Sequence, residues 1–304
     1  MTENTSPLIS ILVATYNGEK FILDQLESLY NQTYSNKELI IVDDCSTDNT
    51  VKIIENWSTN KSNVKLYTFK ENLGYLKNFE RGIKLCEGNY ISLCDQDDIW
   101  DIEKTYKLYQ KIGKNDLAYC NSSFVDEDLK NLNKSFKDKS NMLSSNDPLN
   151  YLIRNNISGH ALLFKKDLLV SNFKFPEFIT HDRWLAFLAS SRNGTVFLDE
   201  SLVKYRIHNN NSLGGKKRIK KNKKTQKIEA ASKIKSLCEI LPNNFQNEKK
   251  GLETVYLSYV NNNVINRFKR CIFFLKNYNR ILAIPKKTKA KKIFYALSMF
   301  NKIR

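Results

Sequence analysis

Short apolar runs alternate with segments of helical periodicity along the first part of the chain. Residues 9–15 are almost continuously apolar, as in a strand buried on both faces of a parallel sheet. In residues 19–31, apolar side chains recur every three or four positions, which predicts a helix. The alternation continues and predicts strands at residues 39–42, 64–69, 90–94 and 117–124, and helices at 47–57 (capped by Ser46), 75–86 and 102–112. This order predicts an α/β fold with a mostly parallel central sheet covered on both faces.

The alternation is less regular in the second part of the chain. Residues 126–148 are polar and are expected to form a flexible loop. The pattern then predicts a helical turn at residues 151–154, a strand at 161–164, a helix at 181–191, a strand at 195–198 and helices at 228–241 and 252–275. Residues 216–227 are a lysine run, expected to be a linker or an exposed helix start. We therefore divide the chain into an α/β domain, residues 1–214, and a basic helical C-terminal region, residues 215–304.

Composition excludes several classes of protein. The chain has 304 residues, 41% of them hydrophobic, with only 10 Gly and 5 Pro, so collagen-like, low-complexity and wholly disordered chains are excluded. The six cysteines show no paired spacing and are expected to be reduced core thiols. No secretory signal and no run of about 18 apolar residues is recognised. We expect a cytoplasmic protein that can rest on a membrane without crossing it.

Positive charge is concentrated at the C-terminal end. Residues 1–210 carry 25 Lys and Arg against 28 Asp and Glu, a net charge of −3, whereas residues 211–304 carry 24 against 4, a net charge of +20. Such a density attracts polyanions, either nucleic acid or an anionic membrane surface. The alternative is a solvated basic surface with no partner.

Polar residues follow three of the predicted strands. They are Ala14-Thr15-Tyr16-Asn17, Asp43-Asp44-Cys45-Ser46 and Asp95-Gln96-Asp97-Asp98. Ligands of open parallel sheets bind outside the carboxyl ends of the strands, so these residues are the place to look for a site. Neither GxGxxG nor GxxxxGK[ST] occurs, which excludes a dinucleotide fingerprint and a Walker phosphate loop.

Asp95, Asp97 and Asp98 place three carboxylates within four residues. Like charges this close repel one another unless a cation neutralises them, and carboxylates with phosphate oxygens and water suit Mg²⁺ or Mn²⁺. A divalent ion would draw a diphosphate to this strand end. The alternative is that Asp97 or Asp98 only caps the next helix while the others are solvated.

Three motifs in order resemble glycosyltransferase family 2, whose members are inverting enzymes with the Rossmann-like GT-A nucleotide-sugar fold. The motifs are SILVATYN at 10–17, ELIIVDDCSTD at 38–48 and GNYISLCDQDDIW at 88–100, and the resemblance extends through HDRW at 181–184 and YRIH at 205–208. It covers roughly residues 7–214. The DQDDIW form and the late HDRW are most similar to rhamnosyltransferase-like bacterial enzymes that build surface polysaccharides.

The resemblance assigns the nucleotide and metal sites. Ala14, Thr15 and Tyr16 would line the nucleotide pocket, and Asp44 would accept a hydrogen bond from the base N3–H that uracil and thymine share, so it does not distinguish UDP from dTDP. Asp95 would lie against the ribose and Asp97 would ligate the metal that bridges the diphosphate. The alternative for Asp43 and Asp44 is helix capping, because DDCSTD is also a helix-start sequence.

The resemblance also assigns the general base to Asp182. An inverting transfer needs one carboxylate that takes the acceptor's proton while its oxygen attacks the anomeric carbon. Asp182 precedes an apolar helix pattern, so a plain N-cap is the alternative. Family members often have Glu-Asp here, and this chain has His181-Asp182, which leaves the contribution of His181 open.

The remaining candidates surround this centre. His208 would be a further metal ligand, with Arg206 near the phosphates, although a lone histidine is usually structural. Gly159 and His160 are expected beside the acceptor, where glycine permits close backbone approach; His160 is equally consistent with a packed side chain. Trp100 and Trp184 would stack on sugar faces or lie in the core.

These residues predict an inverting, Mn²⁺- or Mg²⁺-dependent hexosyltransferase. It would move a sugar, with rhamnose as the leading candidate, from a dTDP- or UDP-sugar to a hydroxyl of a bacterial surface polysaccharide or a lipid-linked acceptor. The alternative from another class is a non-catalytic nucleotide-sugar or polyanion binder that retains the fold. The basic tail would contact an anionic membrane, pack on the catalytic domain or join a homo-oligomer, and without an accompanying RNA-binding or zinc-finger motif nucleic acid is not expected.

Overall fold

The computed structural model describes residues 6–209 and 222–302. Its strands are β1 (Ile9–Thr15), β2 (Lys37–Asp43), β3 (Val64–Thr68), β4 (Tyr90–Cys94), β5 (Ile99–Trp100), β6 (Leu117–Val125), β7 (Asn131–Ser135), β8 (Leu162–Lys165) and β9 (Thr195–Arg206). The α-helices are α1 (Ile22–Tyr30), α2 (Thr50–Ser58), α3 (Tyr75–Leu85), α4 (Lys104–Ile112), α5 (Phe136–Lys139), α6 (His181–Ser190), α7 (Lys223–Glu239), α8 (Gln246–Val260), α9 (Val264–Lys276), α10 (Tyr278–Ile281) and α11 (Lys289–Ser298).

The strands form one sheet in the order β3-β2-β1-β4-β8-β6-β9-β5, with β7 beside β6. The first four strands are parallel, and Ile9 of β1 pairs with Lys37 and Tyr90 of its neighbours. β8 joins β4 and β6 in antiparallel orientation, and β6 and β9 are again parallel. The expected α/β class with Rossmann-like crossovers is confirmed.

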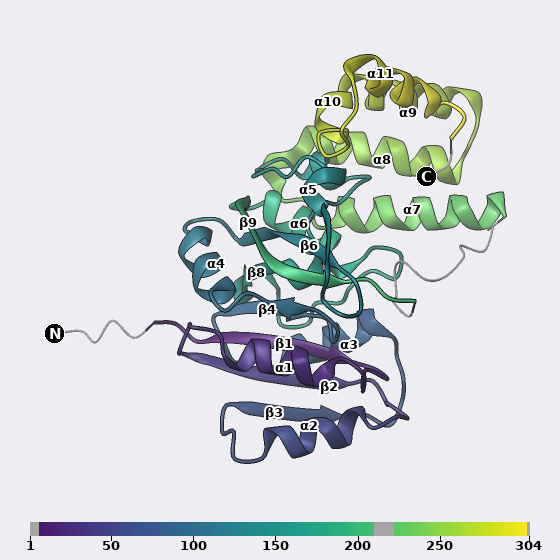
Figure 1. The fold of residues 1–304 in the computed structure, drawn as a ribbon. Coiled ribbons are helices and arrows are strands. Elements are labelled where there is room, and N and C mark those ends of the chain that lie inside the picture. The colour runs from purple at the N-terminus through teal and green to yellow at the C-terminus, as the bar shows by residue number, and fades with distance from the viewer. Residues whose placement is uncertain (1–5, 210–221, 303–304) are drawn as a thin grey trace.

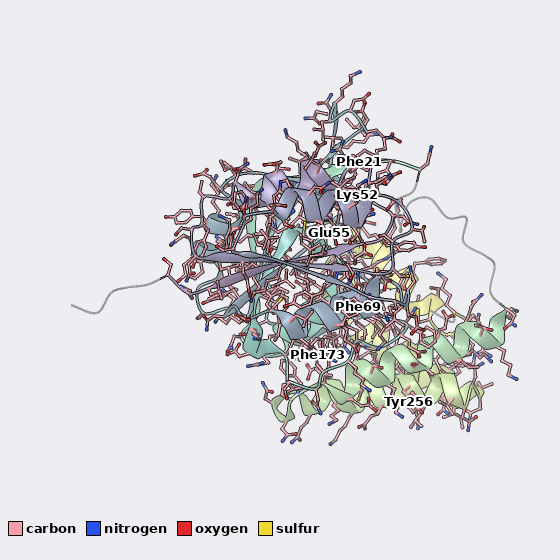
Figure 2. The ribbon with its side chains drawn as sticks, turned by 90° about the horizontal axis from the view of Figure 1, so that it is seen from below. Phe21, Lys52, Glu55, Phe69, Phe173 and Tyr256 are labelled. Carbon is pink, nitrogen blue, oxygen red and sulfur yellow. The ribbon has the colours of Figure 1, made fainter. Side chains whose placement is uncertain are left out.

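Helices cover both faces of the sheet because successive residues of β1 point to opposite sides. Ile11 and Val13 contribute to an apolar cluster with α1, α2 and α4, whereas Leu12 contributes to a second cluster with α3 and α6. Figure 2 shows Lys52 of α2 on one side of the sheet and Tyr256 of α8 on the other. Burial on both sides explains why the parallel strands read as unbroken apolar runs.

Three local predictions are wrong. Residues 126–148 contain β7 and α5, and α5 begins with a capping box between Ser135 and Asp138, so this polar segment is not wholly a loop. The last strand continues from Thr195 to Arg206, because it pairs with β6 and β5 beyond its apolar start. Ser46 does not cap α2, which begins at Thr50; its hydroxyl donates to Asp43 Oδ1 at 2.5 Å instead.

The C-terminal helices pack on the α/β domain (Figure 1). Apolar residues of α7 to α11 share one buried cluster with the sheet and α6. Arg280 of α10 makes a two-point contact with Asp147, at 2.6 and 2.9 Å, and also binds Glu248 at 2.8 Å. The expected helix at 252–275 is divided between α8 and α9, and the boundary at 214/215 and the lysines at 216–221 lie outside the described residues.

Candidate active site

The carboxyl ends of β1, β2 and β4 lie side by side at one edge of the sheet. Thr15 pairs with Asp43, and Val13 pairs with Cys94. Directly beyond these pairs, the Gln96 amide accepts a hydrogen bond from Tyr16 N at 2.8 Å and donates one to Tyr16 O at 3.0 Å. A Cβ on Gly18 would lie 2.4 Å from Gln96 Oε1, so only glycine fits beside this clamp. The segments that follow β1 and β4 are therefore fixed against each other.

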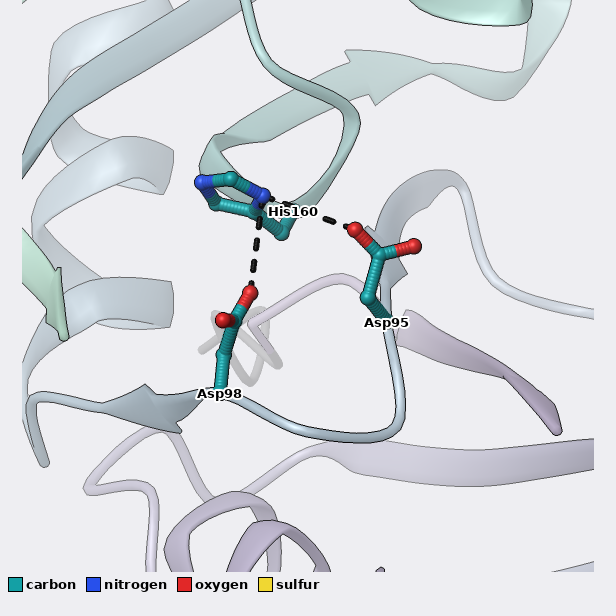
Figure 3. Close-up of side chains that lie close together, drawn as sticks. All are labelled: Asp95, Asp98 and His160. Carbon is teal, nitrogen blue, oxygen red and sulfur yellow. Dashed lines mark ion pairs between the residues drawn. The ribbon is translucent and has the colours of Figure 1, made fainter. Parts of the chain in front are cut away.

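Asp95, Asp98 and His160 form a compact cluster at this edge (Figure 3). His160 Nδ1 lies 3.5 Å from Asp95 Oδ2 and 3.4 Å from Asp98 Oδ2, and its Nε2 lies 3.0 Å from Ser122 Oγ. The Tyr205 ring stacks on the imidazole at 5.0 Å. His160, which was expected beside the acceptor, is thus a buried partner of the carboxylates.

Burial and the charges of neighbouring residues have opposing effects on the pKa values of this cluster. Burial raises the pKa of Asp98 to about 8, with Asp97 and Asp95 adding to the rise and His160 opposing it. Burial would also raise the pKa of Asp95, but the hydrogen bond and charge of His160 outweigh it, and that pKa is lowered. Burial opposes protonation of His160, yet Asp98 and Asp95 raise its pKa overall. Asp98 therefore keeps its proton near neutral pH, whereas Asp95 is ionised.

Asp98→Asn should change the pH dependence of stability. Because the folded-state pKa of Asp98 is raised from 3.8 to about 8, its contribution to stability is full below about pH 4 and is lost as pH rises toward 8. The raised pKa of His160 acts in the same direction. In thermal unfolding with a chelator, the Tm of Asp98→Asn relative to wild type should increase from about pH 5 to about pH 8. The exposed carboxylate Asp101 supplies the control, and a difference that is constant with pH would contradict the assignment.

Asp97 lies between Asp95 and Asp98 in the sequence and pairs with His208. His208 Nε2 is 2.8 Å from Asp97 Oδ2, and the Asp97 side chain is 14% exposed whereas Asp98 is fully buried. Burial raises the pKa of Asp97, Asp95 adds to the rise, and His208 opposes it. The sequence-based grouping of Asp97 with His208 thus corresponds to a direct contact in the structure.

Arg206 holds the acidic segment in place. Its backbone N–H donates to Asp98 Oδ1 at 3.0 Å and its Nε donates to Asp97 O at 2.9 Å. The guanidinium also contacts Asp24 Oδ2 at 3.3 Å and stacks over the Phe21 ring at 4.5 Å. This side chain is only 3% exposed, and its contacts position Asp97 and Asp98. Its expected place near the phosphates stays a prediction.

The residues assigned to the nucleotide differ in how far they are exposed. Tyr16 is 46% exposed at the strand edge and Ala14 is half-buried, whereas Thr15 is buried and its hydroxyl donates to Asp43 Oδ1 at 2.8 Å. Asp44 accepts hydrogen bonds from the backbone N–H groups of Leu73 at 3.0 Å and Gly74 at 2.7 Å, and from Arg81 at 2.6 Å. These contacts show that Asp43 and Asp44 order the loops around the edge without capping α2.

Asp182 lies in the first turn of α6, directly after His181, whose ring meets the Tyr75 ring at 5.9 Å. Burial raises the pKa of the Tyr75 hydroxyl, and the charges of Asp182 and Asp95 raise it further. Asp182 Oδ1 accepts a hydrogen bond from Arg183 N at 2.6 Å, and the cap position itself is occupied by Thr180. Asp182 is therefore not the N-cap of its helix.

His181 packs beneath the backbone of Gly159. Its ring contacts Phe79 at 4.5 Å, and both ring nitrogens are buried with no hydrogen-bond partner among the described residues. Burial lowers its pKa, although Asp182 and Asp95 oppose this, so the ring is neutral. A Cβ on Gly159 would lie 2.4 Å from His181 Nε2. The close approach expected at Gly159 is made by this histidine.

Gly159→Ala should destabilise the protein by about 1–3 kcal/mol. The added methyl group would clash with the His181 ring, and the aromatic rings packed around His181 prevent that ring from moving away. Urea unfolding measures the change. Ser158→Ala, one residue earlier at a position whose side chain makes no cap hydrogen bond, should cost no more than about 0.5 kcal/mol. Equal stability of the two variants would show that His181 moves freely.

The two candidate sugar-stacking tryptophans lie in the core. Trp100 is 3% exposed and Trp184 is 6% exposed, and the Trp184 ring packs against Phe175 at 5.7 Å. Lys104, which the sequence analysis did not single out, is buried with its Nζ 2.9 Å from the centre of the Trp100 ring. Burial lowers its pKa to about 7. Neither indole therefore presents a face to a sugar in this structure.

Comparison with known proteins extends the similarity over most of the chain. The family model for glycosyl transferase family 2 matches residues 10–169. The dTDP-rhamnosyl transferase RfbG of Shigella flexneri is 32% identical over 216 residues, which cover 66% of this chain and 73% of that protein. The matched segment contains β1, β2, β4 and the whole Asp95–Asp98–His160 cluster.

Solved structures share the fold at low sequence identity. S. aureus TarS 1-349 in complex with UDP-GlcNAc has a TM-score of 0.59 and 20% identity, covering 96% of this chain and 90% of that one. The mannosyltransferase PcManGT from Pyrobaculum calidifontis, in complex with GDP-Man and Mn²⁺, has a TM-score of 0.55 and 15% identity, covering 98% and 82%. With the family match, the shared fold and the acidic residues at the end of β4, the chain belongs to glycosyltransferase family 2 and is a glycosyltransferase of the GT-A fold.

Proposed function

We propose that this chain transfers a hexosyl group, with inversion, from a dTDP- or UDP-sugar to a hydroxyl of a bacterial surface polysaccharide or lipid-linked acceptor, and that the reaction needs Mn²⁺ or Mg²⁺. The observation that carries the proposal is the meeting of Asp95 and Asp97 with the ends of β1 and β2 at one edge of the sheet. We assign this activity to residues 1–214 and treat residues 215–304 as an accessory region.

The residues at this edge fit a divalent cation. Asp95, Asp98 and His160 each offer one ligand atom, all within 4.8 Å of one another, and the buried Asp98 Oδ2 has no hydrogen-bond partner among the described residues. Carboxylate oxygens suit Mg²⁺ and Mn²⁺. When bound, the cation would neutralise the negative charge of the departing diphosphate. We assign its ligands to the accessible Asp97 with His208, supported from behind by Asp98 and His160.

Asp182 is proposed to receive the acceptor's proton. As the hydroxyl oxygen forms a bond to the anomeric carbon, the bond from that carbon to the diphosphate oxygen breaks, and the proton passes to the Asp182 carboxylate. A single displacement from the face opposite the leaving group inverts the anomeric configuration. The position of Asp182 supports this arrangement, because the preceding His181 packs against Gly159, the neighbour of His160 in the acidic cluster.

The strand ends of β1 and β2 are proposed to hold the nucleotide. Tyr16 presents an exposed ring. Asp44 is 1% exposed and accepts hydrogen bonds from Leu73, Gly74 and Arg81, so the base N3–H would use the carboxylate lone pair that these three donors leave. Uracil and thymine offer the same donor group, so selection of the sugar depends on other contacts. The similarity to the dTDP-rhamnosyl transferase RfbG favours dTDP-rhamnose.

Calorimetry with a panel of nucleotide sugars, in Mn²⁺ and then in chelator, tests the proposal. We expect dTDP-rhamnose to bind in Mn²⁺ and to lose affinity in chelator. Slow Mn²⁺-dependent hydrolysis of the bound donor would separate an enzyme from a non-catalytic binder. Binding that is the same with and without the metal, or binding of no sugar nucleotide in the panel, would contradict the proposed function.

A further inference from the structure

Large apolar side chains lie exposed on two of the C-terminal helices. Val264, Ile265, Phe268 and Ile272 of α9 are between 47% and 65% exposed, and their spacing puts them on one side of the helix. On α11, Phe294 is 73% exposed and Leu297 is 50% exposed. We call these six residues the α9–α11 face.

Direct contacts hold the two helices side by side. Cys271 Sγ of α9 lies 3.7 Å from the carbonyl oxygens of Ala296 and Leu297 in α11. The Phe268 ring meets the edge of Phe300, just beyond α11, at 4.8 Å. Figure 1 shows α9 and α11 together at the end of the molecule opposite β3 and α2, away from the rest of the sheet.

The segment that carries this face is basic throughout. Residues 264–302 contain 11 Lys and Arg and no Asp or Glu, whereas residues 1–210 have a net charge of −3. Lys287, Lys291 and Lys302 line a shallow hollow together with Phe294. Lysine ammonium groups and a protruding phenylalanine therefore share one small area, which is complementary to a surface that is anionic outside and apolar beneath.

This combination favours one occupant over two others. A second copy of the chain would bring two acid-free, strongly basic faces together, and their repulsion opposes association. Nucleic acid would pair with the lysines but gains little from exposed aliphatic side chains such as Val264, Ile265 and Leu297. An anionic bilayer uses both features, because apolar side chains enter the acyl boundary while lysines bind lipid phosphates.

We propose that the α9–α11 face inserts into the headgroup region of an anionic lipid bilayer and holds the enzyme on that surface. Among the helices that the structure describes, none is long and apolar enough to span a membrane, so the contact is one of adsorption to a single leaflet. The proposal rests on the helices alone and does not depend on the donor or the acceptor.

Vesicle sedimentation with the full chain tests the proposal. We expect binding to phosphatidylcholine vesicles that contain phosphatidylglycerol, little binding to phosphatidylcholine alone, and loss of binding as salt rises. The double variant Ile265→Ser/Phe294→Ser should bind about 10-fold more weakly at the same ionic strength. The matched double variant Ile102→Ser/Val170→Ser, at positions 52% and 68% exposed on the α/β domain, should bind like wild type.

Thermal unfolding of both double variants checks that they fold, since all four positions are exposed. Failure of wild type to bind charged vesicles, or equal loss in the two variants, would overturn the proposal. Tight binding of an RNA oligomer that Ile265→Ser/Phe294→Ser weakens, without binding to charged vesicles, would assign the face to nucleic acid. Conversion of a dimer to a monomer by that variant would assign the face to a second copy. The assay contains no sugar nucleotide, so its outcome is separate from the test of the proposed function.

Discussion

Replacing Asp182 by asparagine should lower the turnover number about 1000-fold while the affinity for the donor stays within about two-fold of wild type. Asparagine has the same shape and its side-chain oxygen can still accept the hydrogen bond from Arg183 N, so the first turn of α6 should remain intact. What is lost is the group that takes the acceptor's proton. Transfer to the acceptor under saturating donor, together with donor binding by calorimetry, separates these two effects.

The control for this variant is Asp167→Asn, which changes an exposed carboxylate elsewhere on the α/β domain. It should leave both turnover and donor affinity unchanged. Full turnover by Asp182→Asn would remove Asp182 from the mechanism, and the proton would then need another acceptor near the end of β4. A parallel loss of donor affinity would instead indicate that Asp182 holds the donor.

The architecture of the first half of the chain follows from its hydrophobic pattern. Strands such as β1 and β4 are buried on both faces, and that burial produces the apolar runs from which they were predicted. The long extension of β9 was not predictable in the same way. The strand passes through exposed positions such as Glu200 and Ser201, so its hydrophobic pattern is interrupted. It continues because it pairs with β5 and β6, and this pairing cannot be read from the pattern of apolar residues.

Local sequence identified which residues meet at the sheet edge but not how they are connected. Asp95, Asp97 and Asp98 could be located because they directly follow a recognisable strand. His160 comes from a segment 62 residues beyond Asp98 and joins it only because β8 inserts between β4 and β6. Nothing in the sequence around Gly159 and His160 signals this contact.

Other discrepancies arise where a side chain that was expected to bind a ligand serves the protein itself. Arg206 was expected near the phosphates, and in the structure its guanidinium donates hydrogen bonds to Asp97 O and Asp24. Gln96, which carried no assignment, locks the segment after β1 to the segment after β4 through Tyr16. Contacts of this kind join residues that are far apart in the sequence. They depend on tertiary packing, so no motif or periodicity in the sequence predicts them.

Asp97→Asn should weaken binding of the sugar nucleotide in Mn²⁺ by about 100-fold or more, and the remaining binding should no longer depend on the metal. Asparagine keeps the volume of the side chain and can keep its contact with His208, so the change removes one negative charge beside the cluster. Calorimetry of donor binding in Mn²⁺ and in chelator measures the loss. Asp101→Asn, a few residues further along the same segment, should bind as wild type does.

Comparison of Asp97→Asn with Asp98→Asn decides which carboxylates hold the cation. If the metal lies at the accessible Asp97 and His208, as we propose, Asp97→Asn has the larger effect on donor affinity, while Asp98→Asn acts mainly on stability through its raised pKa. The reverse order would transfer the metal to the Asp95–Asp98–His160 cluster, where His160 would have to give up its proton before it could ligate. In that case metal binding would release a proton from His160, and calorimetry in buffers of different ionisation enthalpy would detect it.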